Sequence, residues 1–181
     1  MSQFISVFDM FKIGVGPSSS HTLGPWRASQ EWISKLKKTQ VFLLTDNIKV
    51  DLYGSLSLTG KGHATDYAIL LGLSGADPEY VPIKDIDGII NSIKETNLLY
   101  LNNEKMISFS IDNINFNKEF LPLNPNGLTF TAFKDGEIIS KETYYSIGGG
   151  FIIQEEDSLV DEIEVTKQNL PYPINRAVEL D

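Results

Sequence analysis

Two histidines are the only imidazoles in this sequence of 181 residues, and each lies in a segment of small and polar residues. His21 belongs to the run SSSHT (residues 18–22), and His63 belongs to the run GKGHATD (residues 60–66). An imidazole titrates near neutral pH and can accept a proton once a neighbour fixes its tautomer. The sequence therefore offers two candidates for general acid–base chemistry.

The SSSHT run could bind an anion. Gly14 and Gly16 precede it and permit unusual backbone angles. A loop of this kind that leads into a helix presents free N–H groups, hydroxyls and the positive end of the helix dipole. Serine and threonine are also the preferred N-caps, but capping would explain one or two of these hydroxyl residues and not the whole run. Anion binding and capping both stay open for Ser18, Ser19, Ser20 and Thr22.

His63 and Asp66 are three residues apart at the expected start of a helix, which would place them on one face. A lone histidine is usually structural or merely exposed. Because both histidines precede helical patterns, a shared site would explain their common position. It requires the two loops to open onto the same face of the domain, in a cleft open to solvent, whereas structural roles would put the imidazoles on unrelated surfaces or in the core.

Two later runs contain turn residues. NPNG (residues 124–127) is explained by turn chemistry alone. The three glycines of YSIGGGF (residues 145–151) would weaken a strand, so they predict a bulge or a place where another backbone or a ligand comes close.

The elements that position these runs begin with a loop over residues 11–25. Pro25 is tolerated only in a first turn, so the following helix should start near residues 20–22 and end at the lysines of residues 35–38. A strand is predicted over residues 48–54, and residues 59–75 predict a glycine-rich loop that opens a buried helix. A third helix over residues 85–96 presents four isoleucines at helical spacing: Ile86, Ile89, Ile90 and Ile93.

From Leu98 onward the sequence consists of short β-type runs with a turn at residues 134–136. The prediction is an α+β fold, with amino-terminal helices packed on a mostly antiparallel mixed sheet.

The mass, net charge and cysteine count of the sequence exclude several classes of function. The mass of 20.2 kDa fits one globular domain. The net charge of −9 disfavours nucleic acid as a partner, and residues 155–181 contribute eight acids against two basic side chains. The absence of cysteine removes disulfides and thiolate ligands, and no signal peptide or membrane span is evident, so we expect a cytoplasmic protein with no membrane partner.

Four runs, in this order and at these separations, resemble the β-type domain of the bacterial iron–sulfur L-serine dehydratases. They are KIGVGPSSSHTLGPWRA, TGKGHATDYAILLGL, PNG and YSIGGGF. The resemblance implies a β-type domain over residues 1–154, similar to the substrate-binding domain of some phosphoglycerate dehydrogenases. Residues 155–181 resemble the acidic linker towards a catalytic α-type domain, which would make the chain an amino-terminal piece of a longer enzyme.

The resemblance implies an L-serine ammonia-lyase of serine catabolism. L-serine would lose water and its α-proton to give aminoacrylate, which hydrolyses to pyruvate and ammonia. A 4Fe–4S cluster held by cysteines of the α-type domain is implied, with no metal on this chain, which alone would be inactive. The expected partners are L-serine, the α-type domain and a second copy in a homodimer.

The resemblance also suggests the site. His63 is the candidate base for the α-proton, and His21 a donor or orienter. Ser18, Ser19, Ser20 and Thr22 would hold the serine carboxylate, and the further substrate-binding candidates are Lys61, Thr65, Asp66 and Asn126. The sequence departs from the family at two positions: Asn124, where histidine is common, and Ala64, where glycine is more usual.

Two alternatives remain. The loop could bind serine or another small anion as an effector, without catalysis. A serine hydrolase using Ser20 and His21 is a weaker alternative, since adjacent residues rarely aim at each other and the sequence has no G-x-S-x-G elbow.

Overall fold

The computed structural model describes residues 18–156. The glycines at 14 and 16 and most of the expected acidic linker lie outside these residues.

The three predicted helices are present. Helix α2 (Leu23–Lys38) begins directly after the SSSHT run and carries three lysines in its last turn, where they complement the helix dipole. Helix α5 (Thr65–Leu73) is buried along most of its length, as predicted. Helix α6 (Ile83–Thr96) is amphipathic and buries Ile86, Ile90 and Ile93.

The strands form one mixed sheet of seven members in the order β2-β3-β1-β5-β6-β7, with β4 also paired to β1. Strand β1 runs parallel to β3 and β4, and all other pairs are antiparallel. The fold is therefore α+β, as the sequence predicts. The strands are β1 (Asn47–Leu52), β2 (Leu98–Leu101), β3 (Lys105–Ser108), β4 (Ile114–Phe116), β5 (Gly127–Lys134), β6 (Glu137–Gly148) and β7 (Phe151–Gln154).

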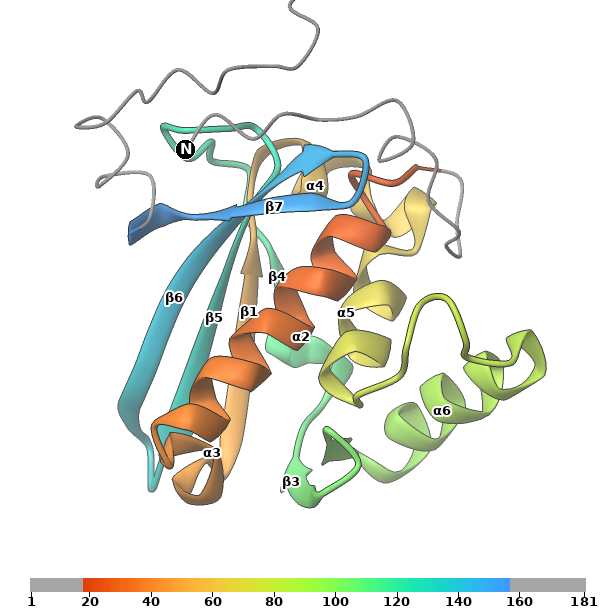
Figure 1. Cartoon of the computed structure of the whole chain (residues 1–181), viewed down its shortest axis with the longest axis vertical. Helices are drawn as coiled ribbons and strands as arrows, with labels where there is room; N and C mark the ends of the chain where they lie inside the picture. Colours follow the sequence, from red (N-terminus) through yellow and green to blue (C-terminus); the bar gives the residue numbers. More distant parts are fainter. Residues whose placement is uncertain (1–17, 157–181) are drawn as a thin grey trace, which may run out of the picture.

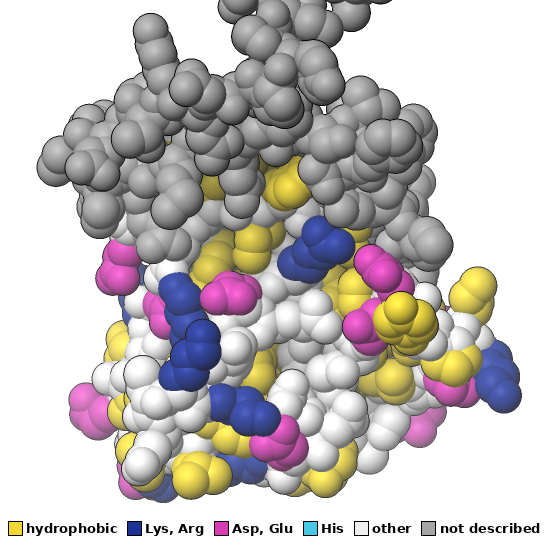
Figure 2. All heavy atoms as spheres, viewed as in Figure 1, with side chains coloured by type: hydrophobic (Ala, Val, Ile, Leu, Met, Phe, Trp, Pro, Cys, Tyr) yellow, Lys and Arg dark blue, Asp and Glu magenta, His cyan; other side chains and the backbone are white. Residues whose placement is uncertain are grey.

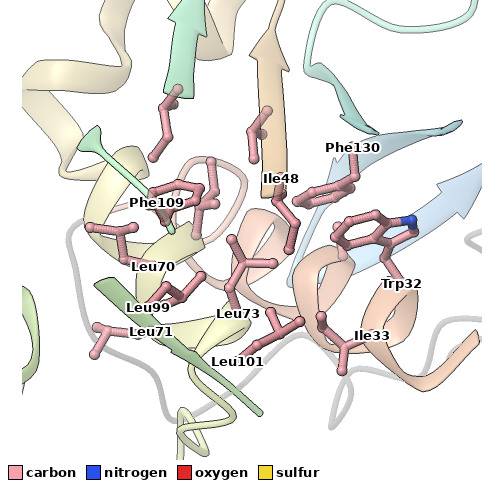
Figure 3. Packing of buried hydrophobic residues seen from close by; sticks show 14 of the residues in the cluster. Trp32, Ile33, Ile48, Leu70, Leu71, Leu73, Leu99, Leu101, Phe109 and Phe130 are labelled. Carbon is pink, nitrogen blue, oxygen red and sulfur yellow. The ribbon is translucent and has the colours of Figure 1, made fainter. Parts of the chain in front are cut away.

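The core lies between this sheet and helices α2 and α5, which lie on the same side of the sheet in Figure 1. Alternate residues of β1 point toward the helices, so Ile48 and Val50 are fully buried. The indole of Trp32 on α2 stacks on the ring of Phe130 on β5, with centroids 5.0 Å apart (Figure 3). Acidic and basic side chains are interspersed over the outer surface on this side of the molecule (Figure 2).

The prediction of a loop over residues 59–64 is wrong in part, because most of this segment is helical. The chain leaves β1, turns at Gly54 with φ of +54°, and forms the short helix α4 (Gly54–Thr59) followed by the 3₁₀ helix η1 (Gly60–His63). Glycine in the left-handed region lets the chain reverse within one residue. Two turns of helix are too short to show an apolar period, so the sequence pattern does not reveal them.

Three other short elements were also unpredicted: helix α3 (Val41–Leu44), the 3₁₀ helix η2 (Ile111–Asn113) and strand β4.

The glycine run forms the connection between β6 and β7. The register of the two strands shifts between Ser146 and Gly148, and Gly148, Gly149 and Gly150 all have positive φ. A Cβ at Gly150 would lie 2.5 Å from a side-chain carbon of Leu23 on α2. The predicted bulge is confirmed, whereas the group that comes close to Gly150 is a side chain and not the expected backbone or ligand.

Within residues 18–156, no helix has the length and apolar character that crossing a membrane requires.

Candidate active site

The two imidazoles lie side by side. The ring centroids of His21 and His63 are 4.9 Å apart, with the ring planes tilted by 39°. His21 lies in the loop before α2, and His63 ends η1 just before α5. The expectation that both loops open onto one face of the domain is confirmed.

His21 is surrounded by polar atoms on both sides of its ring. Its Nδ1 lies 3.0 Å from the hydroxyl of Ser20 and 3.4 Å from that of Ser18. Its Nε2 faces α4, 3.1 Å from Ser55 Oγ, 3.3 Å from Ser55 O and 3.0 Å from Thr59 Oγ1. These contacts hold the ring from the SSSHT loop and from α4 at once.

His63 makes a single hydrogen bond within the described residues, from Nδ1 to the main-chain oxygen of Thr59 at 2.9 Å. A carbonyl oxygen only accepts, so Nδ1 carries the proton. In the neutral ring Nε2 then keeps its lone pair, which is the form that a general base requires.

Burial is the main cause that lowers the pKa of His21 below its ordinary value of 6.5. The Ser55 carbonyl opposes this shift, and the charge of protonated His63 adds to it. The shift favours the neutral ring of His21, which has one ring nitrogen as a donor and the other as an acceptor.

The expected cleft is not open at both histidines. His63 is half-buried, but only 8% of the surface of His21 is exposed. The expectation of a solvent-open cleft is wrong for His21, because α4 covers its Nε2 edge.

The hydroxyl residues of the loop have different environments. Thr22 is the N-cap of α2 but makes no side-chain capping bond; its hydroxyl donates backward to Ser18 O at 2.7 Å. Ser18 and Ser20 lie 3.2 Å apart through their hydroxyls. Ser19 is exposed, and its side chain makes no hydrogen bond to another residue of the 18–156 range. Helix capping therefore does not explain this run.

The GKGHATD run contributes Lys61, Thr65 and Asp66 near His63. Lys61 is exposed, with its ammonium 5.0 Å above the ring of Phe116. Thr65 is fully buried, and its hydroxyl has no hydrogen-bond partner in the described part of the chain. Burial raises the pKa of the half-buried Asp66, whose carboxylate accepts from the main-chain N–H of Tyr67 at 3.0 Å.

The NPNG turn is hydrogen-bonded to α4, the helix that contacts His21. The N–H of Ser55 donates to Pro125 O at 2.7 Å, which connects the turn to α4. Asn126 donates from Nδ2 to Ser146 O, while its Oδ1 is buried without a partner in residues 18–156. Asn124 accepts from the N–H of Asn126 at 2.9 Å, so its side chain stabilises the turn.

Ser55 and Thr59 are the residues that sequence reasoning missed. Both belong to α4, an element that was not predicted. Their spacing of four residues, just before the GKGHATD run, is the signal that could have placed them on one helical face.

Comparisons with known proteins show the family of this chain. Residues 6–157 match the protein family described as "Serine dehydratase beta chain". The chain belongs to the serine dehydratase beta chain family. It is 46% identical over 179 residues to an L-serine dehydratase of Haemophilus influenzae, 45% identical to L-serine dehydratase TdcG of Escherichia coli, and 38% identical to an L-serine dehydratase of Streptomyces coelicolor. Each alignment covers 97% of this chain and 39% of the relative, so the chain spans about two fifths of the length of these relatives.

Membership of the serine dehydratase beta chain family raises the question of an iron–sulfur cluster. The sequence contains no cysteine, and residues 18–156 contain no group of three or more histidine, cysteine or acidic side chains that could hold a metal ion. The residues of this beta chain therefore do not fit a cluster.

Ala64 is the position where the family resemblance predicts glycine, and the backbone explains why. Ala64 has φ of +56° and ψ of +37°, in the left-handed region between η1 and α5. Glycine adopts this conformation at little cost, whereas a Cβ crowds the following carbonyl. This beta chain therefore carries backbone strain beside His63.

Proposed function

We propose that this chain is the β-type part of an L-serine dehydratase and that the His21–His63 pair binds and deprotonates L-serine. The observation that carries the proposal is the contact between the two imidazoles where the loop before α2 meets α4 and η1. The relatives named L-serine dehydratase supply the substrate and the reaction.

In the proposed reaction L-serine loses its α-proton and its hydroxyl group as water, which leaves aminoacrylate. Addition of water to aminoacrylate then releases ammonia and gives pyruvate. His63 Nε2 accepts the α-proton, because its Nδ1 is committed to the Thr59 carbonyl. His21 is held more tightly and orients His63 and the substrate.

The SSSHT loop is proposed to bind the polar groups of the substrate. Ser19 is the exposed hydroxyl donor for the carboxylate, and Ser18 and Ser20 lie at the His21 edge. Thr22 supports the loop through its bond to Ser18 O. Lys61, Thr65, Asp66 and Asn126 complete the proposed binding residues.

A 4Fe–4S cluster is proposed to belong to the α-type domain of the complete enzyme, where cysteines would hold it. This chain has none to contribute, so no step of the reaction is derived through the cluster. We further propose that residues 1–154 form the β-type domain, with residues 155–181 as the linker, and that the complete enzyme is a cytoplasmic homodimer.

The test is His63→Ala in the complete enzyme, with kcat and KM for L-serine measured separately. A positioned base contributes about 10²–10⁴-fold, so kcat should fall by about this factor while KM changes much less. Added imidazole should restore part of the lost rate. If kcat stays near that of the wild type while serine affinity or cooperativity changes, the domain is regulatory and the proposed base is wrong.

A further inference from the structure

Within residues 18–156, Thr59 is the one residue with atoms at hydrogen-bonding distance from both imidazoles. It ends α4, and its main-chain oxygen accepts the hydrogen bond from His63 Nδ1 at 2.9 Å. Its hydroxyl oxygen lies 3.0 Å from His21 Nε2. One residue thus contacts the first ring through its backbone and the second through its side chain.

The hydroxyl hydrogen of Thr59 already has an acceptor. It donates to the main-chain oxygen of Ser55 at 2.9 Å, one turn earlier in α4. A threonine hydroxyl has one hydrogen and two lone pairs, so toward His21 its oxygen accepts. Ser55 O lies 3.3 Å from His21 Nε2 and would face a lone pair if that nitrogen were unprotonated. Both contacts therefore favour the Nε2–H tautomer of His21, and the Ser55 hydroxyl, 3.1 Å from the same nitrogen, can also accept from it.

This tautomer fixes the direction of the hydrogen bonds on the other edge of the ring. His21 Nδ1 then has a lone pair and accepts from Ser20 Oγ at 3.0 Å. Ser20 in turn accepts from Ser18 at 3.2 Å. The result is a chain of hydrogen bonds with one direction, from Ser18 through Ser20, His21 and Thr59 to the carbonyl of Ser55.

We propose that Thr59 is a positioning residue that sets opposite tautomers in the two histidines, Nδ1–H in His63 and Nε2–H in His21. The inference rests on the proposed function for its catalytic consequence, because the Nε2 lone pair of His63 is useful only if that ring is the base. The tautomers themselves follow from the contacts alone.

The side chain and the backbone of Thr59 can be separated by substitution. Thr59→Val removes the hydroxyl and keeps the shape and the carbonyl. It should therefore loosen His21, which keeps its contacts to Ser20 and Ser55, and leave His63 bound. Thr59→Ser retains the hydroxyl and should behave as the wild type. Thr39→Val is a matched control, because Thr39 is also exposed and also donates its hydroxyl to main-chain oxygens of its helix, but it lies at the far end of α2 from His21.

The direct readout is ¹⁵N NMR of the histidine ring nitrogens in the 181-residue chain, which has only two histidines to assign. We expect Nδ1–H for His63 and Nε2–H for His21 in the wild type, Thr59→Ser and Thr39→Val. Thr59→Val should leave His63 unchanged and give His21 a detectable fraction of the Nδ1–H tautomer, because of the two contacts that favour Nε2–H only the longer one, to the Ser55 carbonyl at 3.3 Å, is left. All variants should give folded amide spectra. An Nε2–H tautomer for His63, or an unchanged His21 in Thr59→Val, would overturn the proposal.

A kinetic readout in the complete enzyme tests the catalytic consequence. The net contribution of one hydrogen bond corresponds to a fall of about threefold to tenfold in kcat for Thr59→Val, with KM affected less and with rescue in Thr59→Ser. An unchanged kcat would overturn the positioning role. The outcomes of the two proposals are distinguishable, because the tautomers can be as predicted even if His63→Ala shows that His63 is not the base.

Discussion

Trp32 and His21 lie eleven residues apart on one continuous loop and helix, and their surroundings differ in kind. Trp32 is fully buried against the ring of Phe130, and its indole N–H has no hydrogen-bond partner in the described chain. His21 is almost as buried, but polar atoms from the SSSHT loop and α4 contact both of its ring nitrogens. Apolar contact area holds the first side chain, and directed hydrogen bonds hold the second.

This difference separates the residues that stabilise the fold from the residues that form the site. Burial of apolar surface is non-directional and contributes most of the free energy of folding. Hydrogen bonds contribute less net free energy but fix orientation and protonation state. We therefore expect substitutions in the core to reduce stability and substitutions at the histidines to reduce activity.

The largest effect should come from Trp32→Ala. Removing the indole leaves a cavity against Phe130, and the expected loss in the free energy of unfolding is about 3–5 kcal/mol. The measurement is urea denaturation of the chain, with His63→Ala in parallel. His63 is half-buried and makes one hydrogen bond within residues 18–156. His63→Ala should therefore lower the free energy of unfolding by about 1 kcal/mol or less. Equal losses in the two variants would contradict the division between core and site.

Gly72→Ala should have the next largest effect. Gly72 lies where α5 meets α2, and a Cβ there would come 2.5 Å from the main-chain oxygen of Trp26. Overpacking of this kind costs about 1–3 kcal/mol. Gly88→Ala in α6 is the matched control, because its Cβ would meet no atom within 4 Å. Alanine is the better helix former there and should stabilise by about 0.5–1 kcal/mol. Destabilisation by both variants would contradict the assignment of the loss at Gly72 to its close contact with Trp26.

The parts of the fold that were predicted from the sequence are those with a repeated apolar pattern. The helices α2 and α6 and the strands β1, β5 and β6 show such patterns. Helix α4, with six residues, and strand β4, with three, are too short to show a repeated apolar pattern and were missed. The parallel pairing of β1 with β3 and β4 depends on contacts between distant segments, which a local pattern does not encode.

The site was predicted in part for a similar reason. The pairing of His21 with His63 followed from the chemistry of two similar runs. Ser55 and Thr59 were missed because serine and threonine are common and nothing in their types marks them as neighbours of an imidazole. Their role depends on the position of α4, which the left-handed turn at Gly54 sets.

Ala64→Gly should improve stability beside the site. Ala64 is held at φ of +56°, a conformation that costs an alanine about 1–2 kcal/mol. Glycine is more flexible when unfolded, so we expect a net gain of about 0.5–1 kcal/mol, measured by urea denaturation. Ala68→Gly, in the buried interior of α5, should destabilise and serves as the matched control. A loss of stability in Ala64→Gly would show that the left-handed residue is not strained.

The smallest expected effect is a pH dependence of stability that comes from His21. Burial lowers the pKa of folded His21 below 6.5, the value expected when the chain unfolds. Between these two values the unfolded chain binds more protons than the folded chain, so the free energy of unfolding decreases as the pH falls through this window. The stabilising contribution of His21 is complete above pH 6.5.

The measurement is urea denaturation across this pH window. The free energy of unfolding should decrease more steeply in the wild type than in His21→Asn, which keeps polar atoms but has no group that titrates there. Asp66, whose pKa is raised from 3.8, acts with the opposite sign in both proteins and cancels in the comparison. Parallel curves for the two proteins would mean that His21 is solvated as well in the folded chain as in the unfolded one, which would contradict the burial of this ring in the folded chain.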